Sequence, residues 1–354
     1  MTPLGRLLAR RIAATGPIGI ADFMAECLLH PAHGYYATRD PLGAAGDLPT
    51  PPGPSQGFGE SPRRCPAAGW LDQGAPAPAV LAELGPGRGT LMADVLRAAR
   101  VVPAFGEAVA VHLVEASPVL RTRQAQTLAG HAPVWHDHVA TLPEAPLFLI
   151  ANEFFDALPI RQFQRDAAGW RERQVALDAD GRLAFALSAP APLAALDHRL
   201  GDTVPGEVVE LCPAAQPVAA EIGRRIAAHR GAALVVDYGG WRSRGDTLQA
   251  VRGHAFDDPL AHPGEADLTA HVDFEALARA AVPAAHSTLL PQGVLLDRLG
   301  IAQRADRLAR NLSGAALAVH QAALRRLTHP EEMGRVFQSL ALFPAGGPVP
   351  PAYA

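Results

Sequence analysis

Residues 80–90 read Val-Leu-Ala-Glu-Leu-Gly-Pro-Gly-Arg-Gly-Thr, and the fold prediction starts from them. The pattern predicts a short buried strand over 80–84, a glycine-rich turn, and a helix over 91–100. The three glycines let the backbone turn tightly and let a ligand approach closely, because no Cβ stands in the way. The helix that follows points its first N–H groups at whatever binds in the turn. Together these elements indicate a nucleotide-type cofactor site on an open α/β sheet.

Two features of this site favour S-adenosylmethionine over a dinucleotide. The glycines are spaced G-x-G-x-G, whereas the dinucleotide fingerprint is G-x-G-x-x-G. Glu83 stands just before the turn, where a carboxylate repels a pyrophosphate but suits a ligand with an ammonium and a sulfonium. Glu115 ends the next predicted strand, over 108–114, where an acid can accept hydrogen bonds from ribose hydroxyls. The predicted cofactor-binding residues in this region are Glu83, Gly85, Pro86, Gly87, Gly89, Thr90 and Glu115.

A third predicted strand, near 132–135, is followed by the polar cluster His136-Asp137-His138. In an adenosyl site this position faces the adenine, so Asp137 or His138 could hold the exocyclic amine. A surface loop explains the cluster equally well. We add Asp137 to the predicted cofactor site.

The fourth predicted strand, over 146–151, leads into Asn152-Glu-Phe-Phe-Asp156. Ligands of open parallel sheets bind outside the carboxyl ends of the strands, so chemistry is expected here. An amide, two carboxylates and two phenylalanines make a receptor for a cation with an apolar stem. The structural alternative is a helix capped by Asn152 with both phenylalanines in the core. We predict that Asn152, Glu153 and Asp156 act on the methyl acceptor.

Two adjacent tyrosines follow a predicted helix over 20–29, in the turn His30-Pro-Ala-His-Gly-Tyr-Tyr36. They are explained either by aromatic packing at a helix end or by a lid over the cofactor or substrate. Tyr35 is predicted to line the acceptor channel.

Composition limits the class of protein. The chain has 354 residues, of which 49% are hydrophobic and 19% charged, and its net charge is −4. It has no apolar run near the roughly 18 residues of a membrane helix, and no electrostatic feature that favours nucleic acid. The sequence contains no lysine, which excludes lysine Schiff-base chemistry and the phosphate-loop lysine. Three cysteines without a C-x-x-C pair fit a reducing compartment, and we expect a cytoplasmic protein.

Residues 1–20 carry three arginines and no acid, which suits an organelle-targeting peptide. The leucine spacing in the same residues also suits the first amphipathic helix of a domain.

Farther on, 247–274 is rich in His and Asp. Solvated and capping roles explain these residues better than a metal site, and no metal is predicted. Residues 161–187 predict a hairpin inserted on the sheet, and the prolines in 61–66 predict a helix break.

In this order, the motifs resemble the MidA family of S-adenosylmethionine-dependent methyltransferases, which includes the mitochondrial complex I assembly-factor arginine methyltransferase. The resemblance covers nearly the whole chain. It rests on Gly16-Pro-Ile18, His30-Pro-Ala-His-Gly-Tyr-Tyr36, Ser55-Gln-Gly-Phe-Gly-Glu60, Glu83-Leu-Gly-Pro-Gly-Arg-Gly-Thr90, Asn152-Glu-Phe-Phe-Asp-Ala-Leu-Pro159, Val236-Asp-Tyr-Gly239, Arg252-Gly-His254 and Ala266-Asp-Leu-Thr-Ala-His-Val-Asp-Phe274. The chain departs from the family between Asp47 and Ser55, where prolines and Gly53 replace a Thr-Ala-Pro-Glu-Ile type run.

The resemblance implies an α/β, Rossmann-like class I methyltransferase with a seven-stranded, mostly parallel sheet. It suggests an N-terminal helical lid or substrate segment over 1–78 and a methyltransferase domain over 79–354, with insertions at about 160–230 and 241–330. From its eukaryotic members it implies symmetric dimethylation of an arginine in a protein acceptor such as a respiratory complex I subunit. Two alternatives stay open: a small-molecule acceptor, or a non-catalytic assembly or binding protein on the same fold. Membrane insertion is not expected, and a homodimer is left open.

Overall fold

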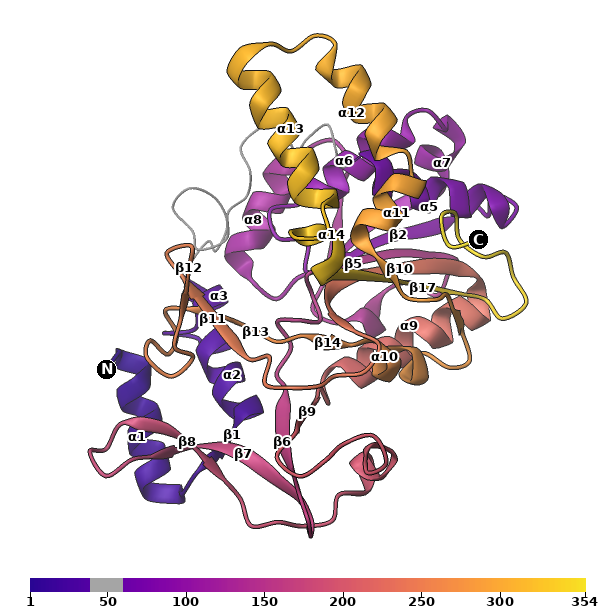
Figure 1. Ribbon diagram of the computed structural model, residues 1–354. Coiled ribbons are helices and arrows are strands. Elements are labelled where there is room, and N and C mark those ends of the chain that lie inside the picture. Colours follow the sequence, from indigo (N-terminus) through magenta and orange to yellow (C-terminus); the bar gives the residue numbers. More distant parts are fainter. Residues whose placement is uncertain (39–59) are drawn as a thin grey trace. The chain divides into compact units, whose positions relative to one another are not determined.

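The computed structural model describes residues 1–38 and 60–354, which fall into two compact units (Figure 1). Unit 1 draws on Met1–Pro49, Asp156–Ala215 and Arg242–Asp273. Unit 2 draws on Thr50–Phe155, Gln216–Trp241 and Phe274–Ala354. The chain therefore passes between the units several times. The predictions that fall on 39–59, including the departure from the family pattern, lie outside the described residues.

Unit 2 is built around one sheet with the order β15-β17-β10-β5-β2-β3-β4. Its strands are β2 (Ala79–Leu84), β3 (Val109–Val114), β4 (Val134–His136), β5 (Leu147–Asn152), β10 (Gly231–Gly240), β15 (Ala285–His286) and β17 (Phe337–Phe343). Strands β10, β5, β2, β3 and β4 are adjacent in this order and run parallel to one another. All six residues of β2 are buried, as expected of a central strand covered on both faces.

The register of the parallel strands brings their carboxyl ends level. Leu84 is paired with Val114 on one side and with Ala151 on the other. Val114 is paired with His136, and Val236 with Asn152. The residues that leave these strands therefore emerge at one edge of the sheet, where ligands of α/β sheets bind.

The sheet is mixed, which corrects the expected architecture. Strand β17 is antiparallel to β10, and β15 and β16 (Leu290–Pro291) are antiparallel to β17. The seven-stranded, mostly parallel description is not confirmed in that form. What the structure has is an α/β fold whose parallel strands carry the predicted glycine turn at the end of β2.

Helices of unit 2 accompany this sheet (Figure 1). They are α5 (Glu60–Asp72), α6 (Thr90–Ala99), α7 (Pro103–Ala108), α8 (Pro118–Thr127), α9 (Ala215–His229), α10 (Phe274–Ala280), α11 (Gln292–Arg298), α12 (Ile301–Ala309), α13 (Gly314–Thr328) and α14 (Met333–Val336), with the short 3-10 helix η1 (Val139–Thr141). The predicted helix break over 61–66 is wrong, because α5 continues through Pro66. Trp70 of α5 is buried and contacts Phe105 edge to face, so tertiary packing supports the helix that the proline disfavours.

Unit 1 has two smaller sheets and three helices among its described residues. The first sheet has the order β1-β7-β6-β9, with β8 paired to β7, and the second has the order β12-β11-β13. The elements are α1 (Pro3–Thr15), β1 (Ile18–Gly19), α2 (Ile20–Leu29), α3 (Tyr35–Thr38), β6 (Arg161–Asp166), β7 (Gly169–Leu177), β8 (Leu183–Leu187), the 3-10 helix η2 (Ala194–Arg199), β9 (Val208–Leu211), β11 (Gln249–Arg252), β12 (Ala255–Asp257), β13 (Asp267–Thr269) and β14 (Val272–Asp273). The predicted hairpin exists as β7 and β8, but in the sheet of unit 1, because β1 and β6 flank β7 there.

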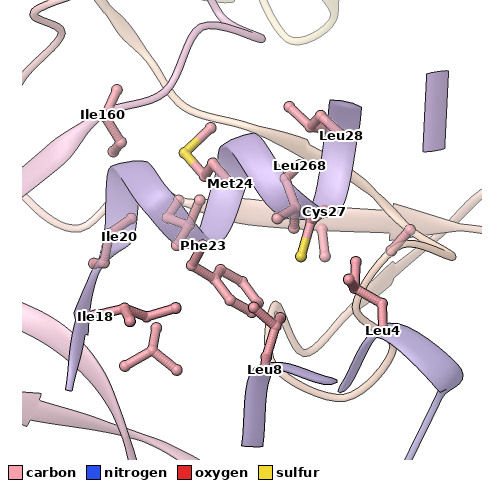
Figure 2. Packing of buried hydrophobic residues seen from close by; sticks show 14 of the residues in the cluster. Leu4, Leu8, Ile18, Ile20, Phe23, Met24, Cys27, Leu28, Ile160 and Leu268 are labelled. Atoms are coloured by element: carbon pink, nitrogen blue, oxygen red, sulfur yellow. The ribbon is translucent and has the colours of Figure 1, made fainter. Parts of the chain in front are cut away.

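The core of unit 1 forms around helix α2 (Figure 2). Phe23, Met24 and Cys27 are fully buried, and their spacing defines one apolar face of the helix. Leu4 and Leu8 of α1 pack into the same cluster, as the amphipathic interpretation of the N-terminal residues predicts. None of the helices in the described residues is long and apolar enough to cross a membrane.

A helical glycine offers a test of the packing in unit 2. Gly223 lies in α9, where an added Cβ would stand 1.8 Å from the carbonyl oxygen of Ala281. Gly223→Ala is expected to lower the stability by about 2 kcal/mol or more, since overpacking against backbone outweighs the gain in helix propensity of about 1 kcal/mol. Gly106→Ala in α7 is the matched control, because its Cβ would meet no atom within 4 Å. Thermal unfolding midpoints measure both; an unchanged midpoint for Gly223→Ala would contradict the packing.

Candidate active site

The glycine turn after β2 is made of left-handed residues. The φ angles of Gly85, Gly87 and Gly89 are 58°, 53° and 77°. The N–H of Gly89 donates to the carbonyl oxygen of Pro86 at 2.7 Å, which closes the turn. The positive φ favours glycine at position 85, and a Cβ there would lie 3.0 Å from Cδ2 of Phe154, which would have to shift. Helix α6 starts at Thr90, directly after the turn.

Glu115 follows β3 and presents a buried carboxylate at the same edge; its exposed fraction is 9%. The N–H of Ser117 donates to Oε1 at 2.8 Å, and Nε2 of Gln124 donates to Oε2 at 3.1 Å. Burial raises the pKa of Glu115, and the hydrogen bonds from Ser117 and Gln124 act in the opposite direction. Each carboxylate oxygen has further acceptor capacity. The group is therefore suited to two vicinal hydroxyls such as those of a ribose.

Gln124 of α8 joins the parts of this site, and the sequence analysis missed it. It is fully buried, and its Nε2 also donates to the carbonyl oxygen of Gly87 at 2.7 Å. Its Oε1 accepts a hydrogen bond from Nε1 of Trp135 at 2.8 Å. The available signal was its place between Leu120 and Leu128 on the apolar face of the helix, where a polar residue needs a reason.

Asp137 leaves β4 at the same edge. Arg121 donates from Nη2 to Oδ1 of Asp137 at 2.6 Å and from Nε to the carbonyl oxygen of Glu115 at 2.8 Å. The side chain of Asp137 is 74% exposed. Its position beside Glu115 agrees with an adenine contact, but that role stays a prediction, as do those of the other assigned residues.

The donor set tests which cofactor fits. Glu83 is 3% exposed near the end of β2, so this edge carries two buried acids, Glu83 and Glu115, beside a turn in which every second residue is glycine. A pyrophosphate would meet carboxylates, whereas a cationic ligand with a diol is complementary to them. The residues present therefore fit an adenosyl sulfonium cofactor.

Asn152 and Glu153 leave β5 next to the glycine turn. Nδ2 of Asn152 donates to Oε1 of Glu153 at 3.1 Å, and the N–H of Glu153 donates to the carbonyl oxygen of Val236 at 3.0 Å. Glu153 has a φ of 51°, in the region that favours glycine. Its side chain is exposed by surface area, yet the protein atoms around the carboxyl desolvate it enough to raise its pKa. Solvent contact is the more direct observation, and it leaves the carboxylate open to an acceptor.

The remaining two predicted residues, Tyr35 and Asp156, lie in unit 1 and are buried, with exposed fractions of 1% and 4%. Tyr36, the residue after Tyr35, also belongs to unit 1. Its hydroxyl donates to Oδ1 of Asp267 at 2.7 Å. Burial raises the pKa of Tyr36 well above its ordinary value, and the carboxylates of Asp267 and Asp156 add to the effect. Tyr36 and Asp267 were not predicted individually, although both stand in motifs that carried the family resemblance.

The structure thus brings together the glycine turn, Glu115 and Asp137 in unit 2, with Asn152 and Glu153 at the same sheet edge. Tyr35 and Asp156 both belong to unit 1. Within 1–38 and 60–354, no group of three or more His, Cys, Asp or Glu side chains is arranged to hold a metal ion.

Comparison with known proteins identifies relatives over most of the chain. Residues 65–291 match the family described as S-adenosyl-L-methionine-dependent methyltransferase. The protein arginine methyltransferase NDUFAF7, mitochondrial, of Xenopus laevis is 36% identical over 94% of this chain and 83% of its own length. The protein of the same name from Homo sapiens is 37% identical over 97% of this chain and 84% of its own length.

Among solved structures, a COG1565 superfamily member from Burkholderia thailandensis bound to S-adenosyl-homocysteine is similar. Its TM-score is 0.83 at 28% identity, over 99% of this chain and 94% of that one. A native structure of a COG1565 superfamily protein from the same organism has a TM-score of 0.81 at 29% identity, with the same coverage.

The expectation of a cytoplasmic protein is contradicted. The relatives from Xenopus laevis, Homo sapiens and Drosophila melanogaster are all named as mitochondrial proteins. The cysteine pattern on which that expectation rested indicates a reducing environment, and it does not distinguish between compartments that provide one.

Gln124 provides a test of the cofactor site. Gln124→Met keeps the volume but removes the partner of the half-buried Gly87 carbonyl and of the half-buried Trp135 indole N–H, at about 1 kcal/mol or more for each group. We expect the affinity for S-adenosyl-homocysteine to fall about tenfold or more. Gln126→Met, on the exposed side of the same helix, is the matched control and should bind like the parent. Calorimetry measures both; an affinity for Gln124→Met within threefold of the parent would contradict the assigned site.

Proposed function

This chain belongs to the family of S-adenosyl-L-methionine-dependent methyltransferases, and from that premise we propose that it methylates an arginine nitrogen of a protein acceptor. The relatives named as protein arginine methyltransferases support the acceptor class, since they match 94–97% of this chain. The observation that carries the proposal is the carboxylate of Glu153 at the tip of β5, level with the glycine turn that follows β2.

The cofactor, when bound, supplies a methyl group on a sulfonium sulfur that a nitrogen lone pair can displace. The residues proposed to hold it are Glu83, Gly85, Pro86, Gly87, Gly89, Thr90, Glu115 and Asp137. Glu83 complements its positive charge, the glycine turn lets it lie against the backbone, and Glu115 accepts from the ribose. Such transfer depends mainly on alignment and exclusion of water, which rigid strand ends are suited to provide.

An arginine acceptor needs negative charge beside it. The guanidinium stays protonated at neutral pH, and it presents a planar set of N–H donors. The carboxylate of Glu153 can accept from two of its nitrogens, which orients the third nitrogen and stabilises the charge that remains on the group. The third nitrogen gives up one N–H proton as it takes the methyl group, and this carboxylate or the solvent that reaches it can accept that proton. Asn152 fixes one oxygen of that carboxylate. Asp156 and Tyr35 keep the roles assigned from the sequence, as a second carboxylate and as a lining residue of the acceptor channel.

We also propose finer details of the fold, the domain bounds and the acceptor. The five parallel strands of unit 2 correspond to the core of a class I methyltransferase sheet, with β17 as its antiparallel member. Residues 1–78 are proposed as a lid or substrate segment, and 79–354 as the methyltransferase domain with its insertions. The family resemblance also supports two finer proposals: the acceptor is a respiratory complex I subunit, and its arginine is symmetrically dimethylated. A homodimer is proposed as a possible assembly, as in the sequence analysis.

Transfer of a radiolabelled methyl group into proteins of a cell lysate tests the function, with mass spectrometry to locate methylated arginine. Symmetric dimethylarginine in a protein acceptor supports the proposal. Label that enters only small molecules would favour a small-molecule acceptor. Cofactor binding without any transfer would favour a non-catalytic binding protein.

Glu153→Gln tests the acceptor site. The amide keeps the shape but cannot balance the charge of a guanidinium, so we expect cofactor affinity close to that of the parent and a loss of transfer of about 100-fold or more, on the scale of a lost transition-state electrostatic contact. Glu107→Gln, an exposed residue of α7 before the amino end of β3, is the control. Calorimetry and single-turnover rates measure the two effects; if binding were lost instead, Glu153 would belong to the cofactor site.

The pH dependence of transfer tests the same group. Desolvation disfavours the charged carboxylate, so Glu153 takes up its proton at a higher pH than an ordinary glutamate, whose pKa is 4.5. Turnover should therefore fall as the pH is lowered through a midpoint above 4.5. The residual activity of Glu153→Gln should lack this fall. An acid fall of the same size and midpoint in Glu153→Gln would contradict the role of Glu153.

A further inference from the structure

We propose that Asp237 is a positioning residue that holds Glu153 at the cofactor edge of the sheet. The inference rests on the proposed function, because it acts through Glu153. Asp237 belongs to β10, the parallel neighbour of β5. Since Val236 is paired with Asn152, the next residues along the two strands, Asp237 and Glu153, come side by side.

Two hydrogen bonds of Asp237 come from main-chain N–H groups, one on each side. Its exposed fraction is 0%. Oδ2 accepts from the N–H of Phe155 at 3.0 Å, across the strand boundary, and Oδ1 accepts from the N–H of Tyr238 at 3.0 Å. A buried carboxylate is costly unless such donors satisfy it. Asparagine has the same shape but only one acceptor oxygen, so its NH₂ would face one of the two N–H groups.

The turn over 153–155, to which Asp237 is hydrogen-bonded, contains an unfavourable backbone conformation. Glu153 is a non-glycine residue in the left-handed region, which is unfavourable for a residue with a Cβ. Such conformations persist where the surroundings over-determine them. Here the chain is fixed on both sides of Phe154, by the bond from the Glu153 N–H to the Val236 carbonyl and by the bond from the Phe155 N–H to Asp237.

Phe154, between these two bonds, links the turn to the cofactor side. Its ring approaches the position that a Cβ of Gly85 would take to 3.0 Å, and it contacts Phe155 edge to face. A change in the turn therefore displaces both the carboxylate of Glu153 and the ring that lies against the glycine turn. Asp237 therefore acts by fixing the position of Glu153, and it needs no contact with the reacting atoms.

The test combines a structure with a double-mutant cycle. In a crystal structure of Asp237→Asn, residue 153 is expected to leave the left-handed region or the Phe155 N–H to lose its side-chain partner; this readout needs no acceptor. In single-turnover assays Asp237→Asn should lower the transfer rate at least about tenfold. In a Glu153→Gln background the same change should add less than about threefold, because the residue through which it acts is already gone. If Asp237→Asn does not fold, Asp237→Ser takes its place in both measurements.

Gln73→Met is the matched control, because Gln73 holds the opposite end of the same strand. Its side chain exchanges two hydrogen bonds of 2.8 Å with the backbone of Gly231, at the start of β10. The control should lower the unfolding midpoint and leave the transfer rate within about threefold of the parent. Equal fold-losses for the Asp237 variant in both backgrounds, or an unchanged turn in its crystal structure, would overturn the proposal. If the parent transfers no methyl group to arginine, the proposed function fails, and the crystal structure still decides whether Asp237 holds the turn.

Discussion

The parallel register of β2, β3, β4, β5 and β10 is the constraint from which the site follows. Backbone hydrogen bonds fix which residues of these strands stand side by side, so the residues that leave them cannot be displaced one at a time. The glycine turn, Glu115, Asp137 and Glu153 come to one edge for this reason, although up to 68 positions separate them in the sequence. A slip of one residue in any pair would turn a whole set of side chains to the other face.

Buried carboxylates give this edge its chemical character. Glu83, Glu115 and Asp237 are each less than a tenth exposed, and Glu153 lies beside them with a raised pKa. Negative charge in such surroundings is retained only with partners, which the main-chain N–H groups of Ser117 and Phe155 supply in two of these cases. An edge of this kind repels phosphates and favours cations. A sulfonium donor and a guanidinium acceptor both satisfy that condition.

Sequence reasoning reached the parts of the fold and site that are local in the chain. The strand, glycine turn and helix over 79–99 follow from a few adjacent residues, and the strand ends at Glu115 and Asn152 follow from apolar runs. Gln124, the Tyr36–Asp267 pair and the role of Asp237 were not reached, because each depends on which distant segments become neighbours. The helix through Pro66 and the antiparallel β17 were missed for the same reason, since tertiary packing and not local propensity decides them.

Two residues at this edge, Gly85 and Glu153, have a positive φ for different reasons. Gly85 has a φ of 58° and Glu153 a φ of 51°, so both residues have the positive φ that favours glycine. At position 85 a Cβ would lie 3.0 Å from the ring of Phe154, so a side chain there would require that ring to shift. At position 153 glycine would adopt the conformation at less cost, yet the chain carries a glutamate there and stabilises it with the Val236 carbonyl and Asp237. Under the proposed function this carboxylate is the group that a cationic acceptor beside the glycine turn would need, which gives a reason for a glutamate in a conformation that favours glycine.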